Sequence, residues 1–382
     1  MQDSISRLSG LDWDFHGDKS DSPFSDLHFH PGRFVPQIPA ALIGSLTSPG
    51  DRVIDPFCGS GTTLVEAQRL GRLGLGIDLN PVSCLVSRSK TLTLLADQVS
   101  KLLLGALDRL TSFRLENASP VSNLEEVPVD VQLVKWYHPE TGEQLRAIWA
   151  FINSQINLTE RELLTFCFST ALMTCCAETR SWGYVCDNTQ PLASRYVDAM
   201  STFREKVESV IDAYQRRDRR WLVREAQTLT PVLVLEGDAY TRLREIPDSS
   251  VDLVVTSPPY FGVIDYVKSQ RLTLEWLGLK TEPLRLLETG ARSSRHRRTA
   301  FTEYSNALEL VVNELCRVLK PNKAFAMVIG ESAKRESVMA RLNQILETAG
   351  FHIDLTINRK IGLRRRQVAS LDNEWLILAN KI

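Results

Sequence analysis

Two short segments of this 382-residue chain carry the residue types of a ligand-binding site at the ends of buried strands. The first, Asp55-Pro-Phe-Cys-Gly-Ser-Gly-Thr-Thr63, follows the apolar pair Val53-Ile54. The second, Thr256-Ser-Pro-Pro-Tyr260, follows the run Val251-Asp-Leu-Val-Val255. Parallel sheets bind ligands in loops at the carboxyl ends of their strands, so we expect both segments to meet at one edge of one sheet. One is then predicted to hold a cofactor and the other a substrate.

The first segment has the features of a loop that holds a nucleotide-like ligand. The turn Gly59-Ser60-Gly61 lets the backbone approach a ligand closely, and the helix that follows offers free amide groups, with Thr62 or Thr63 available as its cap. Asp78 ends the next apolar run roughly 20 positions further on, where a carboxylate can accept hydrogen bonds from both hydroxyls of a ribose. Asp238 ends a later strand and is a candidate to receive an adenine amino group, although it would also suit a helix cap.

The second segment suits a substrate that presents an exocyclic amino group. The nitrogen of cytosine N4 or adenine N6 is conjugated into its ring and is a poor nucleophile, so acceptors must bind its hydrogens and turn its lone pair towards an electrophile. Ser257 and the carbonyl of Pro258 are candidate acceptors, because Pro258 and Pro259 stiffen the loop and carry no amide donors. Tyr260 offers an aromatic face to an extruded base, a contact worth about 1–3 kcal/mol. The alternative is a rigid turn without a ligand.

Together the two segments resemble those of the S-adenosylmethionine-dependent amino methyltransferases of DNA. The resemblance extends over residues 29–91 and 231–329. It implies that Asp55–Thr63 is the cofactor loop and that Thr256–Tyr260 is the catalytic loop. It implies S-adenosyl-L-methionine as the cofactor and direct transfer of its methyl group to a flipped base. A serine before Pro-Pro-Tyr favours cytosine N4, whereas an aspartate at that position favours adenine N6. The order of the two motifs is the reverse of that in many relatives.

The resemblance also implies roles for individual residues. The segment from His30 to Phe34 would pack near the methionine end of the cofactor, Asp55 and Gly59 would line its pocket, and Asp78 would hold its ribose. The catalytic residues are predicted to be Ser257, Pro258, Pro259 and Tyr260. The cofactor-binding residues are predicted to be His30, Pro31, Asp55, Pro56, Phe57, Gly59, Gly61, Thr62, Asp78 and Asp238.

Strands and helices alternate on both sides of a long interruption. This pattern predicts an α/β fold, a doubly wound Rossmann-like methyltransferase sheet with a large, mainly helical insertion. The alternation stops near Thr91 and resumes at Val232, and a connection of that length is an inserted subdomain. The predicted parts are an N-terminal arm with the cofactor-binding half (1–90), the insertion as a candidate target-recognition subdomain (91–230), and the catalytic half (231–382).

DNA is the expected macromolecular partner. The chain has a net charge of −1, so attraction to phosphates must come from local clusters of positive charge. The amino group lies inside a duplex, so the target base must be flipped out at a cost of roughly a few kcal/mol. Two arginine clusters downstream of the catalytic loop are predicted to contact DNA: Arg292, Arg295, Arg297 and Arg298, and Arg364, Arg365 and Arg366. A third cluster falls on a predicted helix: Arg216, Arg217, Arg219 and Arg220.

The cysteine and apolar patterns predict a location and exclude some chemistry. The seven cysteines follow no zinc or disulfide spacing, so we expect a cytoplasmic protein without a metal site, in which Cys58 and Cys84 take no part in catalysis. No apolar run is long enough to span a membrane, so no membrane partner is expected. A cognate restriction endonuclease is a candidate partner from the resemblance, and the sequence predicts no particular oligomeric state.

Two other functions fit parts of the pattern. An RNA guanosine-N2 methyltransferase can share this order of motifs, but it usually has aspartate in place of Ser257 and carries an N-terminal RNA-binding domain. A catalytically inactive nucleic-acid-binding module is the alternative outside enzyme chemistry. The intact Asp55, Gly59, Asp78 and Tyr260 argue against that module.

Overall fold

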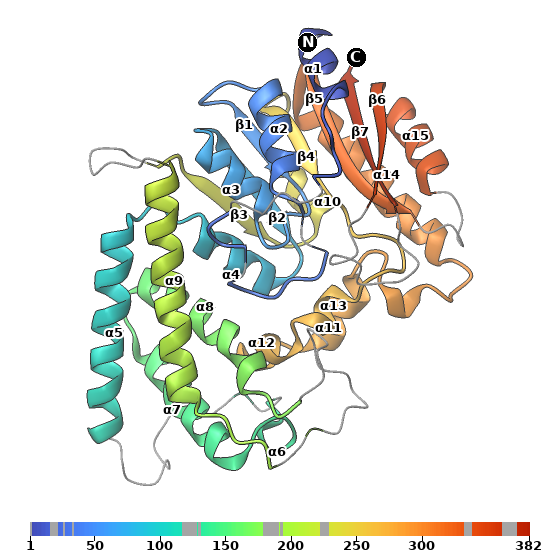
Figure 1. The fold of residues 1–382 in the computed structure, drawn as a ribbon. Coiled ribbons are helices and arrows are strands. Elements are labelled where there is room, and N and C mark those ends of the chain that lie inside the picture. Colours follow the sequence, from blue (N-terminus) through green and yellow to red (C-terminus); the bar gives the residue numbers. More distant parts are fainter. Residues whose placement is uncertain are drawn as a thin grey trace.

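The computed structural model contains one central sheet, and its strands follow the predicted apolar runs (Figure 1). It describes residues 2–15, 22–25, 27–32, 34–116, 128, 131–178, 191, 194–221, 229–331, 338–360 and 373–382. Within these residues seven strands pair in the order β3-β2-β1-β4-β5-β7-β6. Their bounds are β1 (Arg52–Asp55), β2 (Leu73–Asp78), β3 (Val232–Glu236), β4 (Val251–Thr256), β5 (Leu319–Glu331), β6 (Phe351–Lys360) and β7 (Asn373–Lys381).

Strand β1 lies in the middle of the parallel part of the sheet, between β2 and β4. Ile54 is in register with Leu75 on one side and with Val254 on the other. Strands β3 and β5 continue the parallel arrangement outwards, whereas β7 runs antiparallel to both β5 and β6. The carboxyl ends of β1, β2, β3 and β4 therefore share one edge of the sheet, and the polar residues that follow these strands meet there.

Helices cover both faces of the sheet, as expected for a doubly wound fold (Figure 1). Val53, Leu253 and Val255 belong to one core with helices α1 to α3, whereas Ile54 and Val254 belong to a second core with helices α10, α14 and α15. The predicted α/β fold is confirmed. The helices around the sheet are α1 (Gln2–Ser9), α2 (Gln37–Leu46), α3 (Thr62–Arg69), α4 (Pro81–Lys90), α10 (Ala239–Leu243), α14 (Ala300–Val318) and α15 (Val338–Thr348).

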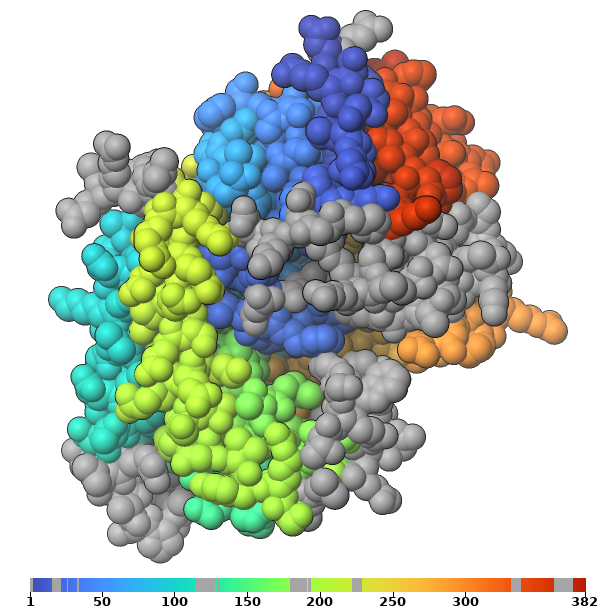
Figure 2. All heavy atoms as spheres, in the orientation of Figure 1, coloured from blue at the N-terminus to red at the C-terminus, as the bar shows by residue number. Residues whose placement is uncertain are grey.

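The insertion forms a helical cluster with a hydrophobic core of its own. In Figure 2 the insertion, cyan to yellow-green, lies below the part of the molecule that contains the sheet, blue to red, and part of the blue N-terminal segment lies between them. His28 of that segment shares a hydrogen bond of 2.7 Å with Ser169 of the insertion. The domain boundaries stay a prediction, because Trp276 of the catalytic half also packs in this core. The insertion contains α5 (Ala96–Glu116), α6 (Leu133–Trp136), α7 (Pro139–Ser154), α8 (Leu158–Cys175) and α9 (Ala199–Trp221).

Two local features differ from the sequence patterns. The segment after the catalytic loop, for which no element was expected, contains α11 (Tyr266–Ser269), α12 (Arg271–Trp276), α13 (Thr281–Leu287) and the short 3₁₀ helix η1 (Arg292–Ser294). Lys320–Asn322, a Lys-Pro-Asn sequence typical of a turn, lies inside β5, where the pairing with β4 is irregular. Among the described residues, no helix combines the length and the apolar character that crossing a bilayer requires.

Arg217 shows that the third arginine cluster includes a structural residue. Its side chain is 0% exposed and pairs with Asp218 at 2.7 Å. It donates hydrogen bonds to the carbonyls of Leu92 at 3.0 Å and Leu94 at 2.6 Å, and it lies over the ring of Tyr214. Arg217 therefore fastens α9 to the segment that follows α4, and it is not available for a phosphate.

We expect Arg217→Ala to destabilise the protein by about 3–5 kcal/mol, because the substitution removes the buried charge that pairs with Asp218 and the donors to two partly buried carbonyls. Urea unfolding monitored by circular dichroism measures this change. The matched control is Arg219→Ala on the exposed side of the same helix, with an expected change within about 0.5 kcal/mol. Equal effects of the two substitutions would contradict the structural role of Arg217.

Candidate active site

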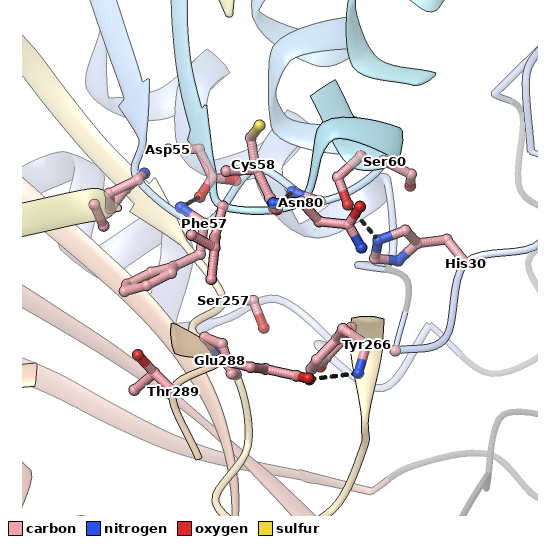
Figure 3. Close-up of a pocket in the computed structure, with 18 of the residues that line it drawn as sticks. His30, Asp55, Phe57, Cys58, Ser60, Asn80, Ser257, Tyr266, Glu288 and Thr289 are labelled. Atoms are coloured by element: carbon pink, nitrogen blue, oxygen red, sulfur yellow. Dashed lines mark hydrogen bonds between the residues drawn. The ribbon is translucent and has the colours of Figure 1, made fainter. Parts of the chain in front are cut away.

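The carboxyl ends of β1, β2 and β4 border a cavity that encloses about 920 Å³, part of it open to solvent. The loop after β1 and the residues after β2 form one wall, with Asp55, Cys58 and Asn80 (Figure 3). Ser257 after β4 lies on the opposite wall, with Tyr266 (Figure 3). The two predicted loops therefore face each other across one cavity.

The loop after β1 is held rigid by side chains from α4. Ser87 donates a hydrogen bond to the carbonyl of Gly59 at 2.8 Å, and the buried Lys90 donates to the carbonyl of Ser60 at 3.0 Å. Gly59 has a φ of 51°, and a Cβ at that position would lie 3.1 Å from the ring of His30. The turn thus brings backbone to the cavity wall, as predicted, and His30 packs against it.

Asp55 connects this loop to the end of β4. Its Oδ1 accepts a hydrogen bond from the Thr256 hydroxyl at 2.7 Å and another from the Phe57 amide at 3.1 Å. The carboxyl is buried, and this burial raises its pKa to about 6, against the lowering effect of those hydrogen bonds. Asp55 also lines the cavity, so it joins the two loops and contributes to the wall.

Asp78 and Asp238 both line the cavity, and both carry hydrogen bonds within the protein. Asp78 accepts from the amides of Gly59 and Asn80 at 2.8 Å each, and burial raises its pKa to about 6. Asp238 accepts from the amide and the hydroxyl of Thr241 at 3.0 Å, so it caps α10. The helix-cap alternative for Asp238 is therefore present in the structure, at a position that also borders the cavity.

The catalytic loop is supported from three directions. Tyr304 of α14 donates to the carbonyl of Pro259 at 3.0 Å. Thr256 is tied to Asp55, as described above. The Tyr260 hydroxyl donates to Oε1 of Glu374 on β7 at 2.8 Å and lies 3.4 Å from the Ser257 hydroxyl. These contacts fix the loop from the sheet, from a helix and from the antiparallel edge.

Tyr260 is the main departure from the predicted site. Its side chain packs in the core with Tyr304 and Met327 and is 8% exposed. It is not among the described residues that line the cavity, so it presents no aromatic face there. In this arrangement of the loop the hydroxyl is directed towards Glu374, and stacking of an extruded base on Tyr260 stays a prediction.

Most of the other predicted site residues lie on the cavity wall. Among the described residues, Pro31, Gly61 and Pro258 do not line it. Gly61 has a φ of 78°, and a Cβ there would lie 2.7 Å from the Ser87 hydroxyl, so this glycine serves helix packing. The predicted residues on the wall are His30, Asp55, Pro56, Phe57, Gly59, Thr62, Asp78, Asp238, Ser257 and Pro259.

Several wall residues were missed by the sequence analysis. Asn80 is 4% exposed, and its side-chain nitrogen has no partner among the described residues, which leaves a buried donor at the wall. Glu288 accepts from the amide of Tyr266 at 2.5 Å, and burial raises its pKa to about 7 (Figure 3). Asn80 follows the end of β2 and was detectable from that position. Tyr266, Glu288 and Thr289 lie in a segment without a recognised motif.

The cavity wall is acidic. Four carboxyl groups line it, from Asp55, Asp78, Asp238 and Glu288, and no lysine or arginine is among its described lining residues. The burial that raises the pKa of Asp55 and Asp78 also strengthens the interaction of any bound charge with these groups. A ligand that carries a positive charge and several hydrogen-bonding groups therefore suits this cavity.

The predicted DNA-contacting arginines are only partly described. Arg297 and Arg298 are exposed, and Arg297 pairs with Glu303 at 3.0 Å. Arg292 and Arg295 are half-buried in the turn around η1. The amide of Arg292 donates to the carbonyl of Ile264, which places this turn beside the segment that follows the catalytic loop. Arg364, Arg365 and Arg366 lie outside the described residues.

Comparison with known proteins links these residues to methylases. Residues 13–88 match the protein family described as DNA methylase. The chain is 34% identical over 108 residues to the type II methyltransferase M.MjaII of Methanocaldococcus jannaschii, a match that covers 27% of this chain and 20% of that protein. It is 26% identical over 273 residues to the type II methyltransferase M.MvaI of Kocuria varians, with 67% of this chain and 58% of that protein covered.

An RNA-modifying enzyme also matches over a shorter segment. The chain is 37% identical over 59 residues to the tRNA (guanine(10)-N2)-dimethyltransferase of M. jannaschii, which is 15% of this chain and 17% of that protein. The chain thus spans less than two thirds of the length of each of these three relatives.

We expect Gly61→Ala to destabilise the protein by about 1–3 kcal/mol, because alanine is strained at a positive φ and its Cβ meets Ser87. Gly105→Ala in the middle of α5 is the matched control. A Cβ there meets only the end of the Arg109 side chain, at 3.4 Å, so this substitution should stabilise the protein by about 0.5–1 kcal/mol. The midpoint of urea unfolding measures both effects, and a stabilising Gly61→Ala would contradict the packing argument.

Proposed function

We propose that this member of the S-adenosylmethionine-dependent DNA amino methyltransferases transfers a methyl group to an exocyclic amino group of DNA, most specifically to N4 of cytosine. The family is confirmed by the DNA methylase match and by the type II methyltransferase relatives. One observation carries the proposal: the glycine-containing loop after β1 and the Ser-Pro-Pro segment after β4 face each other across one cavity (Figure 3).

The cavity residues fit the cofactor, S-adenosyl-L-methionine. Its chemistry is an electrophilic methyl group on a positively charged sulfur. The four carboxyl groups of the wall suit that charge. The unpartnered side-chain nitrogen of Asn80 supplies a donor for a ligand acceptor, and Asp78 supplies acceptors for hydroxyl groups. We propose Asp78 and Asn80 as cofactor contacts, with His30, Asp55 and Gly59 shaping the pocket.

The catalytic loop would bind and orient the target amine. The Ser257 hydroxyl and the Pro258 carbonyl would accept its two hydrogens, which turns the nitrogen lone pair towards the opposite wall. The rigid support of the loop by Thr256 and Tyr304 would keep that orientation without reorganisation during the reaction. Burial raises the pKa of Cys58 well above its usual value, so this cavity thiol stays protonated, and no covalent cysteine is required.

Ser257 supports cytosine N4 over adenine N6 by its resemblance to the family pattern, and adenine N6 is the first alternative. The tRNA guanine-N2 alternative is supported by the 59-residue match. It is weakened by the serine at position 257, where such enzymes usually have aspartate. A nucleic-acid-binding module without activity is the remaining alternative, and the acidic cavity that the two loops share argues against it.

The DNA interface belongs to the proposal as well. We place the arginine turn at Arg292, Arg295, Arg297 and Arg298 on the duplex backbone, because it lies beside the catalytic segment and two of its side chains are exposed. We assign target recognition to the insertion at residues 91–230. A cognate restriction endonuclease is the proposed partner in the cell, and a cytoplasmic location stays a prediction.

The reaction is tested with labelled cofactor and either unmethylated duplex DNA or unmodified tRNA, followed by digestion to nucleosides. We expect N4-methylcytosine from the duplex. Ser257→Ala should lower kcat by a factor of about 100, because one acceptor of the amine hydrogens is lost, while cofactor affinity stays within about twofold. N6-methyladenine or N2-methylguanosine would select one of the alternative substrates, and the absence of any methylated nucleoside would contradict the proposed enzyme.

Cofactor affinity should fall below about pH 6. Burial raises the pKa of Asp78 from 3.8 to about 6, so the free protein holds a proton there below that pH, and a ligand that needs the carboxylate must displace it. Affinity is then expected to fall up to about tenfold per pH unit below the pKa and to stay constant above pH 7. Calorimetric titration with the cofactor at pH 5 to 8 measures this affinity. The Asp78→Asn variant should show a weaker dependence of affinity on pH. An affinity that is constant over this range would contradict the role of Asp78.

A further inference from the structure

A series of polar contacts leads from the catalytic loop to the antiparallel edge of the sheet. It starts at the Ser257 hydroxyl, 3.4 Å from the Tyr260 oxygen, and continues from Tyr260 to Oε1 of Glu374 at 2.8 Å. Oε2 of Glu374 pairs with Arg359 of β6, and Arg359 donates through Nε to the carbonyl of Trp13 at 2.9 Å. These contacts thus connect the catalytic loop to the neighbouring strands β7 and β6 and to the segment that contains Trp13.

The chemistry of the groups decides which of them donates and which accepts in each of these contacts. The Arg359 side chain is 4% exposed and that of Glu374 is 16% exposed, so the two charges compensate each other in the interior. A carboxylate has no hydrogen to give, so the Tyr260 hydroxyl must donate to it. The Tyr260 oxygen then offers only lone pairs, and Ser257 must donate its single hydrogen to Tyr260.

This direction decides what Ser257 can do at the cavity. A serine hydroxyl has one hydrogen and two acceptor lone pairs. With its hydrogen directed at Tyr260, Ser257 presents lone pairs to the cavity that it lines. A hydroxyl that was free to rotate could instead donate to the nitrogen lone pair of the target amine, which is the pair that must attack the methyl group.

We propose that Tyr260 is a positioning residue that makes Ser257 a hydrogen-bond acceptor for the target amine, with Glu374 and Arg359 fixing the direction of the contact. This inference rests on the proposed amino methyltransferase function and concerns the hydroxyl group of Tyr260. Burial and the neighbouring Glu374 raise the pKa of Tyr260 well above its usual value, so its hydroxyl remains a donor at physiological pH.

The test is a double-mutant cycle with Tyr260→Phe, Ser257→Ala and the double variant, using steady-state methylation of the duplex DNA that the wild type modifies. Tyr260→Phe keeps the ring and removes only the hydroxyl. We expect it to lower kcat at least tenfold, with KM for DNA and for the cofactor within twofold of the wild type. In the Ser257→Ala background the same substitution should change kcat less than twofold, because Tyr260 then has no serine to direct.

Each other outcome overturns the inference. An unchanged kcat in Tyr260→Phe would show that the hydroxyl is not needed. Losses that multiply in the double variant would show that Tyr260 acts independently of Ser257. A loss of cofactor affinity or of thermal stability together with activity would assign it a structural role. The matched control for stability is Tyr214→Phe, which removes another buried hydroxyl that donates to a carbonyl, that of Ser89.

The proposed function fails separately from this inference. If the wild type methylates neither DNA nor tRNA, the enzyme proposal itself is wrong. If the wild type methylates DNA and Tyr260→Phe is fully active, only the role of Tyr260 is wrong.

Discussion

The site depends on the hydrogen bond between the Thr256 hydroxyl and the Asp55 carboxyl, at the ends of two neighbouring parallel strands. The register of Ile54 with Val254 places the last residues of β1 and β4 side by side, so the two loops begin next to each other. Asp55 is buried, and a buried carboxyl without partners costs about 1–3 kcal/mol or more. Moving either loop away would remove the Thr256 donor and leave the buried carboxyl with fewer hydrogen bonds, so this contact also keeps the two walls of the cavity together.

The parts of this site that follow directly from strand ends were predictable from the sequence. Apolar runs end at Asp55, Asp78 and Thr256, and parallel pairing of such runs brings their ends to one edge. The helices after the catalytic loop were not predictable in this way, because α11 to α13 are short and take their positions from packing against one another and against the insertion. Glu288 and Tyr266 therefore reach the wall through tertiary contacts that no local pattern records.

Single residues with two plausible roles were the least predictable. A tyrosine after two prolines suits base stacking, yet Glu374, more than a hundred residues later in the chain, draws the Tyr260 hydroxyl into the interior. Gly61 belongs to the loop motif, yet the position of Ser87 on α4 explains why it is glycine. The sequence places Arg217 in a basic helix. Only its hydrogen bonds to the carbonyls of Leu92 and Leu94 show that its buried side chain has a structural role. In each case a partner that is distant in the sequence decides the role.

The acidic wall has an energetic consequence for the whole molecule. Burial raises the pKa values of Asp55 and Asp78 to about 6, which means that ionising these groups costs more in the free protein than in water, although the ionised forms still predominate at pH 7. A cationic ligand in the cavity stabilises the ionised forms of these carboxyl groups. Part of the binding free energy of such a ligand therefore comes from lowering the cost of ionising them. The buried carboxyl groups that are costly to ionise are thus the groups that favour a positively charged cofactor, and contacts of Thr256, Lys90 and Tyr304 hold the loops around them.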